Sequence, residues 1–240
     1  MAILVPYIDP RPQYKPMPKP RIAILASGGG TTTESFINLT LEGKVKAEVV
    51  LVISNKSNAG VFDKVNRINR EKNIDIKTMH IGRSNYPGGK NEIIGMGEQT
   101  KAEEEAILKQ LNENEIDLVL LLGYMKRVGS SIVQKYGWNS SLKSVFESSM
   151  LNTHPGLLPE TKGLFGLRVQ EKVLSSGYSH AGHCIFAVDD EYDDGPVITE
   201  HKVDILPEDT PKSLFERVQR SEKLHLADDV NYFIRKKYGG

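Results

Sequence analysis

The chain has 240 residues, which is enough for one large α/β domain or two small domains with a substantial apolar core. Lys plus Arg and Asp plus Glu both total 31, so the formal net charge is zero and the overall basic excess of most nucleic-acid-binding proteins is absent. The single cysteine, Cys184, excludes an internal disulfide, and no apolar run approaches the ~20 residues of a membrane-spanning helix.

The first 20 residues, MAILVPYIDPRPQYKPMPKP, are rich in proline. They have a short apolar start, but no basic stretch before it and no convincing cleavage site of a secretory signal. Their prolines predict an extended arm, residues 1–20, that leads into one domain over residues 21–240. No linker, repeat or low-complexity segment divides the remaining chain. Because neither a signal sequence nor a membrane-spanning run is recognised, we expect a cytoplasmic protein.

The first half of that domain alternates apolar strands with helices. Strands are expected at 21–27, 47–54, 75–81 and 117–123, and helices at 32–43, 60–73 and about 100–113. The strands are continuous apolar runs, which is typical of strands buried on both faces. This alternation predicts a mostly parallel sheet covered by helices.

The second half has a different pattern. A short strand is expected at 149–153, a helix at 166–177, two strands at 183–188 and 196–205, and an amphipathic helix at 211–237. The two later strands flank the acidic loop DDEYDDG and suit an antiparallel pair. We expect Cys184 to be a small buried residue in the first of them. The fold class is therefore α/β, with a Rossmann-like, mostly parallel sheet and antiparallel strands in the C-terminal half.

A glycine-rich stretch, LASGGGTTT, lies where the first strand passes into the first helix. Unpaired backbone N–H groups and the helix dipole favour an anion at such a place, and glycines let a phosphate approach closely. A tight turn that needs glycine only for its backbone angles explains the pattern equally well. A dinucleotide fingerprint would need glycine at Thr33, and a Walker loop would need a lysine, so NAD and ATP are disfavoured.

Asn152 and His154 lie two residues apart at the end of a strand that Pro155 terminates. They therefore point to the same face, at the edge where open α/β sheets bind ligands. An amide and an imidazole side by side can stabilise the oxyanion of an acyl-transfer reaction, although a lone strand-end histidine is more often structural. A carboxylate from the loop at 189–194 could orient the ring, but the spacing does not decide which one.

Six motifs occur in order: ILASGGGTT, VISNK, DLVLLLGYMKRV, LNTHPGLLP, DEYDDGPVI and ERVQRSE. In this order they resemble the phosphoribosylglycinamide formyltransferases, folate-dependent enzymes of purine synthesis, over roughly residues 21 to 235. The resemblance implies the formyltransferase fold, with a phosphate-binding half at 21–123 and a folate-binding and catalytic half at 124–240. It implies transfer of the formyl group of 10-formyltetrahydrofolate to the amine of 5'-phosphoribosylglycinamide.

The resemblance also implies roles for single residues. Oxyanion stabilisation would fall to Asn152 and protonated His154, and Asp193 would hold the imidazole. The substrate phosphate would lie on Gly30, Thr31 and Thr32, and the same substrate would contact Gln219 and Glu222. The folate pocket would be lined by Lys101, Met125, Lys126, Arg127, Val128, Asn152, Asp189 and Asp190. 10-Formyltetrahydrofolate would act as co-substrate, with no metal.

The chain departs from this family in several places, which indicates a divergent branch. Asp194 stands where glycine is frequent, and Phe186 stands where a histidine is usual. The segments ETKGLFGLRVQEKVL and GSSIVQKYGWNSSLKSVFESS are longer than expected. Alternative functions are a formyltetrahydrofolate deformylase, formyl transfer to another amino sugar or nucleotide amine, and a ligand-binding protein without turnover. In each case we expect small-molecule partners, no nucleic acid and no membrane, in a monomer or homodimer.

Overall fold

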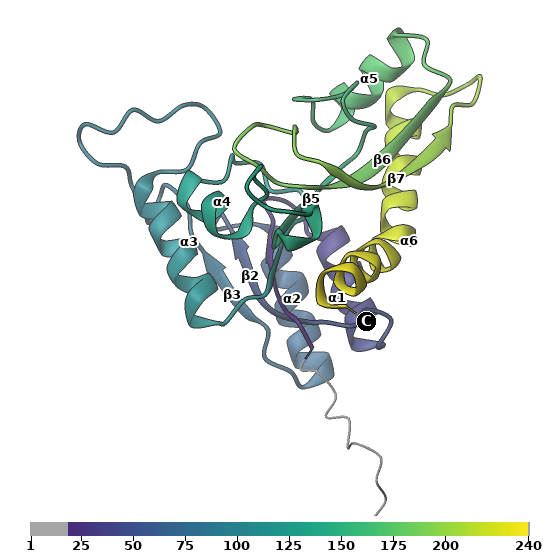
Figure 1. The fold of residues 1–240 in the computed structure, drawn as a ribbon. Coiled ribbons are helices and arrows are strands. Elements are labelled where there is room, and N and C mark those ends of the chain that lie inside the picture. Colours follow the sequence, from purple (N-terminus) through teal and green to yellow (C-terminus); the bar gives the residue numbers. More distant parts are fainter. Residues whose placement is uncertain (1–18, 240) are drawn as a thin grey trace, which may run out of the picture.

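The computed structural model describes residues 19–239, so most of the arm predicted for residues 1–20 lies outside the described residues. In this part of the chain, one sheet of seven strands has helices on both faces (Figure 1). The strands are β1 (Arg21–Leu25), β2 (Glu48–Ser54), β3 (Lys77–His80), β4 (Leu118–Leu121), β5 (Met150–His154), β6 (His180–Ala187) and β7 (Val197–Asp204).

The spatial order of the strands is β3-β2-β1-β4-β5-β6-β7. The pairs from β3 to β5 are parallel, and β5–β6 and β6–β7 are antiparallel. The predicted fold class, a mostly parallel sheet with antiparallel strands in the C-terminal half, is confirmed.

The helices are α1 (Thr31–Leu41), α2 (Gly60–Lys72), α3 (Lys101–Glu113), α4 (Ser130–Tyr136), α5 (Leu167–Ser175) and α6 (Pro211–Tyr238), with a 3₁₀ turn, η1 (Val145–Glu147). α4 and η1 were not predicted, and both lie in the segment at 129–149 that is longer than expected. Seven and three residues are too few to show a helical period in the sequence.

Strand β1 shows why the sheet is covered on both faces. Its side chains alternate in direction, so Ile22 and Ile24 pack in a core with α1, α2 and the C-terminal half of α6. Ala23 and Leu25 point the other way, into a second core with α3 and α4. All four side chains are fully buried, which is the reason that the strand reads as a continuous apolar run.

The 28-residue helix α6 extends from the antiparallel strands β6 and β7 to α1. It begins with Pro211 after a capping box between Thr210 and Ser213, which satisfies the first backbone N–H groups of the helix. Its first half lies against β6, β7 and α5, and it continues along α1 toward the C-terminus (Figure 1). Side chains on one helix can therefore face both the antiparallel strands and the loop that precedes α1.

The order of the strands reverses at β1. The chain leaves β1 through α1 to β2 on one side, while β4 lies on the other side of β1. In open α/β sheets, ligands bind at the carboxyl ends of the strands where the order reverses in this way. The ends of β1, β4 and β5 meet there, and they carry the glycine-rich loop, Gly123 and His154.

Two further expectations concern single residues and the membrane. Cys184 is buried in β6, as expected, and burial raises the pKa of its thiol to about 12. Within residues 19–239, no helix has both the length and the apolar character that crossing a bilayer requires.

Candidate active site

A cavity of about 280 Å³ lies at the reversal point of the sheet. Its walls come from six segments: the loop after β1, the loop after β4, the end of β5, the loop between β5 and α5, the loop between β6 and β7, and α6. It gathers most of the residues that the sequence singled out as catalytic or substrate-binding, which are Gly30, Thr31, Thr32, Met125, Asn152, His154, Asp193, Gln219 and Glu222.

The glycine-rich loop enters the cavity at the start of α1. Gly30 is the N-terminal cap of α1, has a φ of 71° and provides no side-chain cap, so the first backbone N–H groups of the helix are left to other partners. A Cβ atom on Gly30 would lie 2.6 Å from Val61, whereas Gly28 and Gly29 have open space around them. Position 30 therefore requires glycine, because of its backbone conformation and its contact with Val61. Gly28 and Gly29 leave room for a ligand next to the start of the helix.

Asn152 and His154 project into this cavity from the C-terminal end of β5. Asn152 is half-buried, and His154 is 3% exposed. Phe186 lies opposite Asn152 in the register of β5 and β6 and is buried. The strand geometry that placed the amide and the imidazole on one face is as predicted.

Each nitrogen of the His154 ring faces a side-chain oxygen, and only Nε2 is within hydrogen-bonding distance of it. Nε2 lies 2.9 Å from Oγ1 of Thr161, and Nδ1 lies 3.8 Å from Oδ2 of Asp193. Burial lowers the pKa of His154 to about 4, and a backbone hydrogen bond to Thr161 offsets part of that effect. At neutral pH the imidazole in the free protein is therefore uncharged.

Asp193 comes from the acidic loop, on a backbone turn with a φ of 51°. Its carboxylate accepts a hydrogen bond from the Gly163 N–H at 3.2 Å. Burial raises the pKa of Asp193 to about 6, against the effects of the Gly163 hydrogen bond and the nearby Lys162. Of the acidic residues in this loop, the structure places Asp193 beside His154.

The acidic loop and the segment after β5 contact one another beside Asp193. Asp194 forms an ion pair with Lys162, which lies in the segment after β5. The same segment supplies the Gly163 N–H group that binds Asp193. The charge of Asp194 is therefore matched by a cation from this segment.

Helix α6 presents one face to the cavity through Phe215, Gln219 and Glu222. Glu222 is 8% exposed and accepts a hydrogen bond from Oγ1 of Thr32 at 3.3 Å. Burial raises the pKa of Glu222 to about 7, so its carboxyl group is partly protonated at neutral pH. It lies within reach of a ligand held at the N-terminus of α1.

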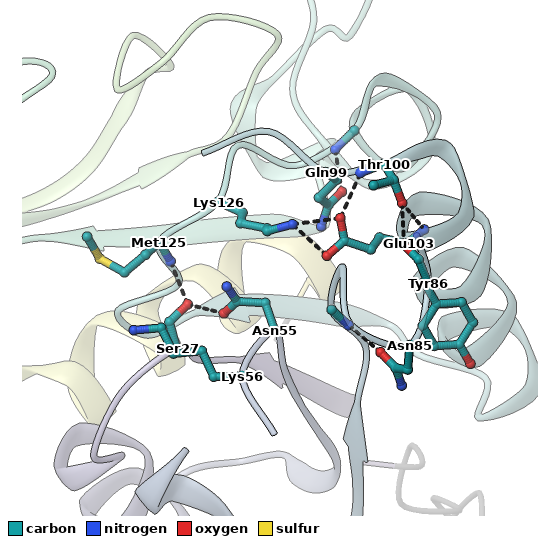
Figure 2. A network of polar contacts seen from close by, with 12 residues as sticks. Ser27, Asn55, Lys56, Asn85, Tyr86, Gln99, Thr100, Glu103, Met125 and Lys126 are labelled. Carbon is teal, nitrogen blue, oxygen red and sulfur yellow. Dashed lines mark hydrogen bonds and ion pairs between the residues drawn. The ribbon is translucent and has the colours of Figure 1, made fainter. Parts of the chain in front are cut away.

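The segment after β4 is fastened to its surroundings by a polar network (Figure 2). The Met125 N–H donates to the Ser27 hydroxyl at 2.8 Å, and Ser27 donates in turn to Asn55. Lys126 points toward α3, where its Nζ lies 2.5 and 2.6 Å from the two carboxylate oxygens of Glu103, and the side chain of Met125 points the other way (Figure 2). Met125 lines the cavity, and the Lys126 side chain anchors the loop.

The remaining residues expected to bind folate lie beside this cavity. Arg127, Val128 and Asp190 line a neighbouring hollow of about 180 Å³, where Arg127 donates to the backbone oxygen of Asp190. Asp189 is half-buried and accepts a hydrogen bond from the Glu191 N–H. Lys101 is exposed at the first position of α3 and is not among the residues that line either hollow.

Several residues that line the cavity or contact His154 were missed by the sequence analysis. Phe215 could have been found, because it precedes Gln219 and Glu222 by four and seven positions and so shares their helical face. Tyr192 is the immediate neighbour of Asp193. Thr161 and Phe165 carry no such signal, because they approach the site through a loop without a period.

The described residues include no group of three or more His, Cys, Asp and Glu side chains arranged to hold a metal ion. The groups that the cavity offers are backbone N–H groups, hydroxyls, two side-chain amides, one imidazole and two carboxyls of raised pKa. This set suits a phosphorylated ligand at one end and proton transfer with oxyanion stabilisation at the other.

Comparisons with known proteins agree with this chemistry. A family model described as formyl transferase matches residues 20–230. The chain is 29% identical over 204 residues to the chloroplastic phosphoribosylglycinamide formyltransferase of Arabidopsis thaliana, and 32% identical over 204 residues to the trifunctional purine biosynthetic protein adenosine-3 of Homo sapiens. These alignments cover 84% and 85% of this chain, but it spans only 61% and 17% of the two relatives.

A solved structure gives the same result for the fold. The phosphoribosylglycinamide formyltransferase of Bacillus halodurans matches with a TM-score of 0.71 and 29% identity. The match covers 90% of this chain and 96% of that one, so the described elements have counterparts along nearly the whole of it.

Proposed function

Because the chain belongs to the formyl transferase family, we propose that it transfers the formyl group of 10-formyltetrahydrofolate to the amine of 5'-phosphoribosylglycinamide, a step of purine synthesis. The observation that carries the proposal is the composition of the cavity. One hollow holds an uncapped helix N-terminus with its glycine-rich loop and, from a different part of the chain, Asn152, His154 and Asp193.

The phosphorylated amine would bind along the α1 side of the cavity. Its phosphate would accept hydrogen bonds from the N–H groups at Gly30, Thr31 and Thr32, where the helix dipole favours an anion. Gln219 and Glu222 would contact the same substrate from α6. With its pKa near 7, Glu222 can donate or accept a hydrogen bond, which suits the hydroxyl groups of a ribose.

The formyl donor would enter between the loop after β4 and the loop between β6 and β7. Met125 lines the cavity there, and the polar network around Ser27 and Lys126 fixes the backbone of that loop (Figure 2). Arg127, Val128 and Asp190 extend the same wall into the neighbouring hollow. Holding both substrates together replaces a costly encounter in solution.

The chemical step forms a bond between the substrate amine and the formyl carbon. The negative charge that develops on the formyl oxygen would be stabilised by the Asn152 amide. The neutral His154 would take the proton of the amine, and the nearby Asp193 carboxylate and the negative charge on the formyl oxygen would both favour the resulting imidazolium. The bond to the folate nitrogen then breaks, and His154 delivers the proton to that nitrogen.

The test is a spectrophotometric assay of folate release from 10-formyltetrahydrofolate, or from its dideaza analogue, with and without 5'-phosphoribosylglycinamide. We expect release that depends on the amine. Asn152→Ala and His154→Ala should each lower the turnover number by about 10²–10³. The exposed Asn66→Ala on α2 serves as the matched control and should retain full activity.

Two results would contradict the proposal. Release of folate at the same rate without the amine would indicate a deformylase, in which water is the acceptor. Release only with a different amino sugar or nucleotide amine would indicate another acceptor. We also propose a cytoplasmic location and a monomer or homodimer. Since the Arabidopsis thaliana relative is named chloroplastic, cell fractionation is the direct check of the location.

A further inference from the structure

The loop that follows β5 folds back beneath the catalytic ring. Thr161 in this loop is 1% exposed, and its Oγ1 lies 2.9 Å from Nε2 of His154 and 2.8 Å from the backbone oxygen of Leu157. A carbonyl oxygen can only accept a hydrogen bond, so the single hydroxyl proton of Thr161 goes to Leu157. The same Oγ1 must then accept a hydrogen bond from His154, which places a proton on Nε2.

We infer that Thr161 is a positioning residue that holds His154 in the Nε2–H tautomer and so reserves Nδ1 as the proton acceptor. The tautomer assignment rests on the hydrogen bond that Thr161 donates to Leu157, and its role in formyl transfer rests on the proposed function. Nδ1 is the nitrogen that faces Asp193. In this tautomer it carries a lone pair at neutral pH and is ready to receive the proton of the attacking amine.

The distance between the ring and the acid supports this assignment. A protonated Nδ1 would donate to the carboxylate, and such charge-assisted hydrogen bonds are about 2.7–2.9 Å long. Nδ1 lies 3.8 Å from Oδ2 of Asp193, beyond hydrogen-bonding distance, so Nδ1 donates no hydrogen bond to this carboxylate. The Asp193 oxygen is held instead by the Gly163 N–H group at 3.2 Å.

The backbone near Thr161 is arranged to admit this hydroxyl. A Cβ atom on Gly156 would lie 2.2 Å from Oγ1 of Thr161, so only glycine at position 156 leaves space for the hydroxyl beneath the ring. Gln170 of α5 is fully buried and donates to the backbone oxygen of Pro155 at 2.7 Å, which fixes the start of the same loop. Gly156 and Thr161 therefore act as a pair.

Three consecutive residues of this loop contact the catalytic acid–base pair and its neighbour. Thr161 binds His154, Lys162 forms an ion pair with Asp194, and Gly163 binds Asp193. This segment thus sets both the proton position on the ring and the place of the carboxylate. A loop that only covered the site would not need contacts of this kind.

The direct test is nitrogen NMR of the full-length protein with ¹⁵N-labelled histidine rings, recorded without substrates at pH 7.5. The His154 signals are assigned by comparison with His154→Gln. We expect a protonated Nε2 and an unprotonated Nδ1 in the wild type and in Thr161→Ser, which keeps the hydroxyl. In Thr161→Val, which has nearly the same shape without the hydroxyl, we expect a mixture of tautomers or a shift to Nδ1–H.

A wild-type spectrum with the proton on Nδ1 would overturn the inference, as would a Thr161→Val spectrum identical to the wild type. If Thr161→Val does not fold, the wild-type and Thr161→Ser spectra decide the question alone. In the kinetic arm, Thr161→Val should lower the turnover number at least about ten-fold with little change in KM, and Thr161→Ser should restore most of it. A wild-type protein with the Nε2–H tautomer but no formyl transfer would remove the proposed function and leave the tautomer assignment in place.

Discussion

The pKa values of His154 and Asp193 are in the reverse of their usual order, because that of Asp193 is the higher. In model compounds aspartate has a pKa of 3.8 and histidine a pKa of 6.5, but burial raises the pKa of Asp193 to about 6 and lowers that of His154 to about 4. Burial acts in opposite directions because it disfavours the charged form of each group. Near neutral pH the pair is therefore a neutral base beside a carboxylate, which is the arrangement that an attacking amine requires.

The rate of the proposed reaction should follow the ionisation of Asp193. The carboxylate is needed to stabilise the imidazolium, so kcat/KM should fall as the pH drops through about 6. A profile of kcat/KM between pH 5 and pH 8 measures this directly. A profile that stays flat down to pH 5 would show that the ionised carboxylate is not required.

The same burial means that the ionised carboxylate of Asp193 destabilises the folded protein. A carboxyl group whose folded pKa lies above its unfolded pKa favours folding fully below pH 3.8, and this contribution is lost as the pH rises through about 6. A rise of this size corresponds to about 3 kcal/mol, so Asp193→Asn should be more stable than the wild type by up to about 3 kcal/mol at pH 7.5. The advantage should shrink at pH 4.5.

Urea unfolding at the two pH values checks this prediction, with the exposed Asp190→Asn in the same loop as control. Asp190→Asn should change the free energy of unfolding by no more than about 0.5 kcal/mol. If Asp193→Asn is less stable than the wild type at pH 7.5, Asp193 makes a stabilising contact that the cavity does not show.

At the scale of secondary-structure elements, the start of α1 is defined by a single glycine. Gly30 has a φ of 71°, and a Cβ atom there would lie 2.6 Å from Val61 of α2. Gly30→Ala combines a left-handed backbone with a clash in the core, so it should cost at least about 2 kcal/mol of unfolding free energy.

Gly29→Ala is the matched control for this prediction, because its Cβ would meet no atom within 4 Å. We expect Gly29→Ala to leave the thermal unfolding midpoint nearly unchanged but to raise the KM for the phosphorylated amine, since the new methyl group occupies the place proposed for phosphate. Equal stabilities of the two variants would contradict this account of the loop.

The loop after β4 is joined to α3 by an ion pair that excludes most water. Glu103 is fully buried and the Lys126 side chain is 12% exposed. Removing one partner of a buried pair leaves the other charge uncompensated, so Lys126→Met should cost about 3–5 kcal/mol. The double variant Lys126→Met/Glu103→Gln should recover at least half of this loss, because the amide still accepts the hydrogen bond from the Thr100 N–H.

A double-mutant cycle of urea unfolding measures the coupling between these two side chains. If the double variant is no more stable than Lys126→Met, the loss of stability in Lys126→Met does not come from the uncompensated charge of Glu103. The KM for the formyl donor adds a second readout. It should be close to the wild-type value in the double variant if the lysine acts through the loop.

At the scale of the whole molecule, the site is assembled from segments that lie far apart in the sequence. The reversal of strand order at β1 brings the ends of β1, β4 and β5 together, and α6 closes the cavity from the antiparallel side. Each substrate can thus be bound by a different part of one sheet.

Local patterns explain what could be predicted from the sequence. The alternation of strands and helices is visible because buried strands such as β4 are continuous apolar runs. The common direction of Asn152 and His154 follows from the two-residue period of a strand. Neither inference needs a long-range contact.

Long-range contacts explain what could not be predicted. The Lys126–Glu103 pair joins residues 23 positions apart, and the Thr161 contact depends on a loop that folds back on itself. Glu103 is the first of three consecutive glutamates in the sequence, and nothing in that run distinguishes it, although it is fully buried. Partners of this kind become visible only when the path of the chain is known.

The central claim is that one cavity transfers a formyl group directly from donor to amine. The most direct measurement follows the carbon of 10-formyltetrahydrofolate labelled with ¹³C in its formyl group, in the presence of 5'-phosphoribosylglycinamide, by mass spectrometry. We predict that the label appears in the N-formyl product in the same amount as the folate released. Label recovered as formate, with no formylated amine, would contradict the account.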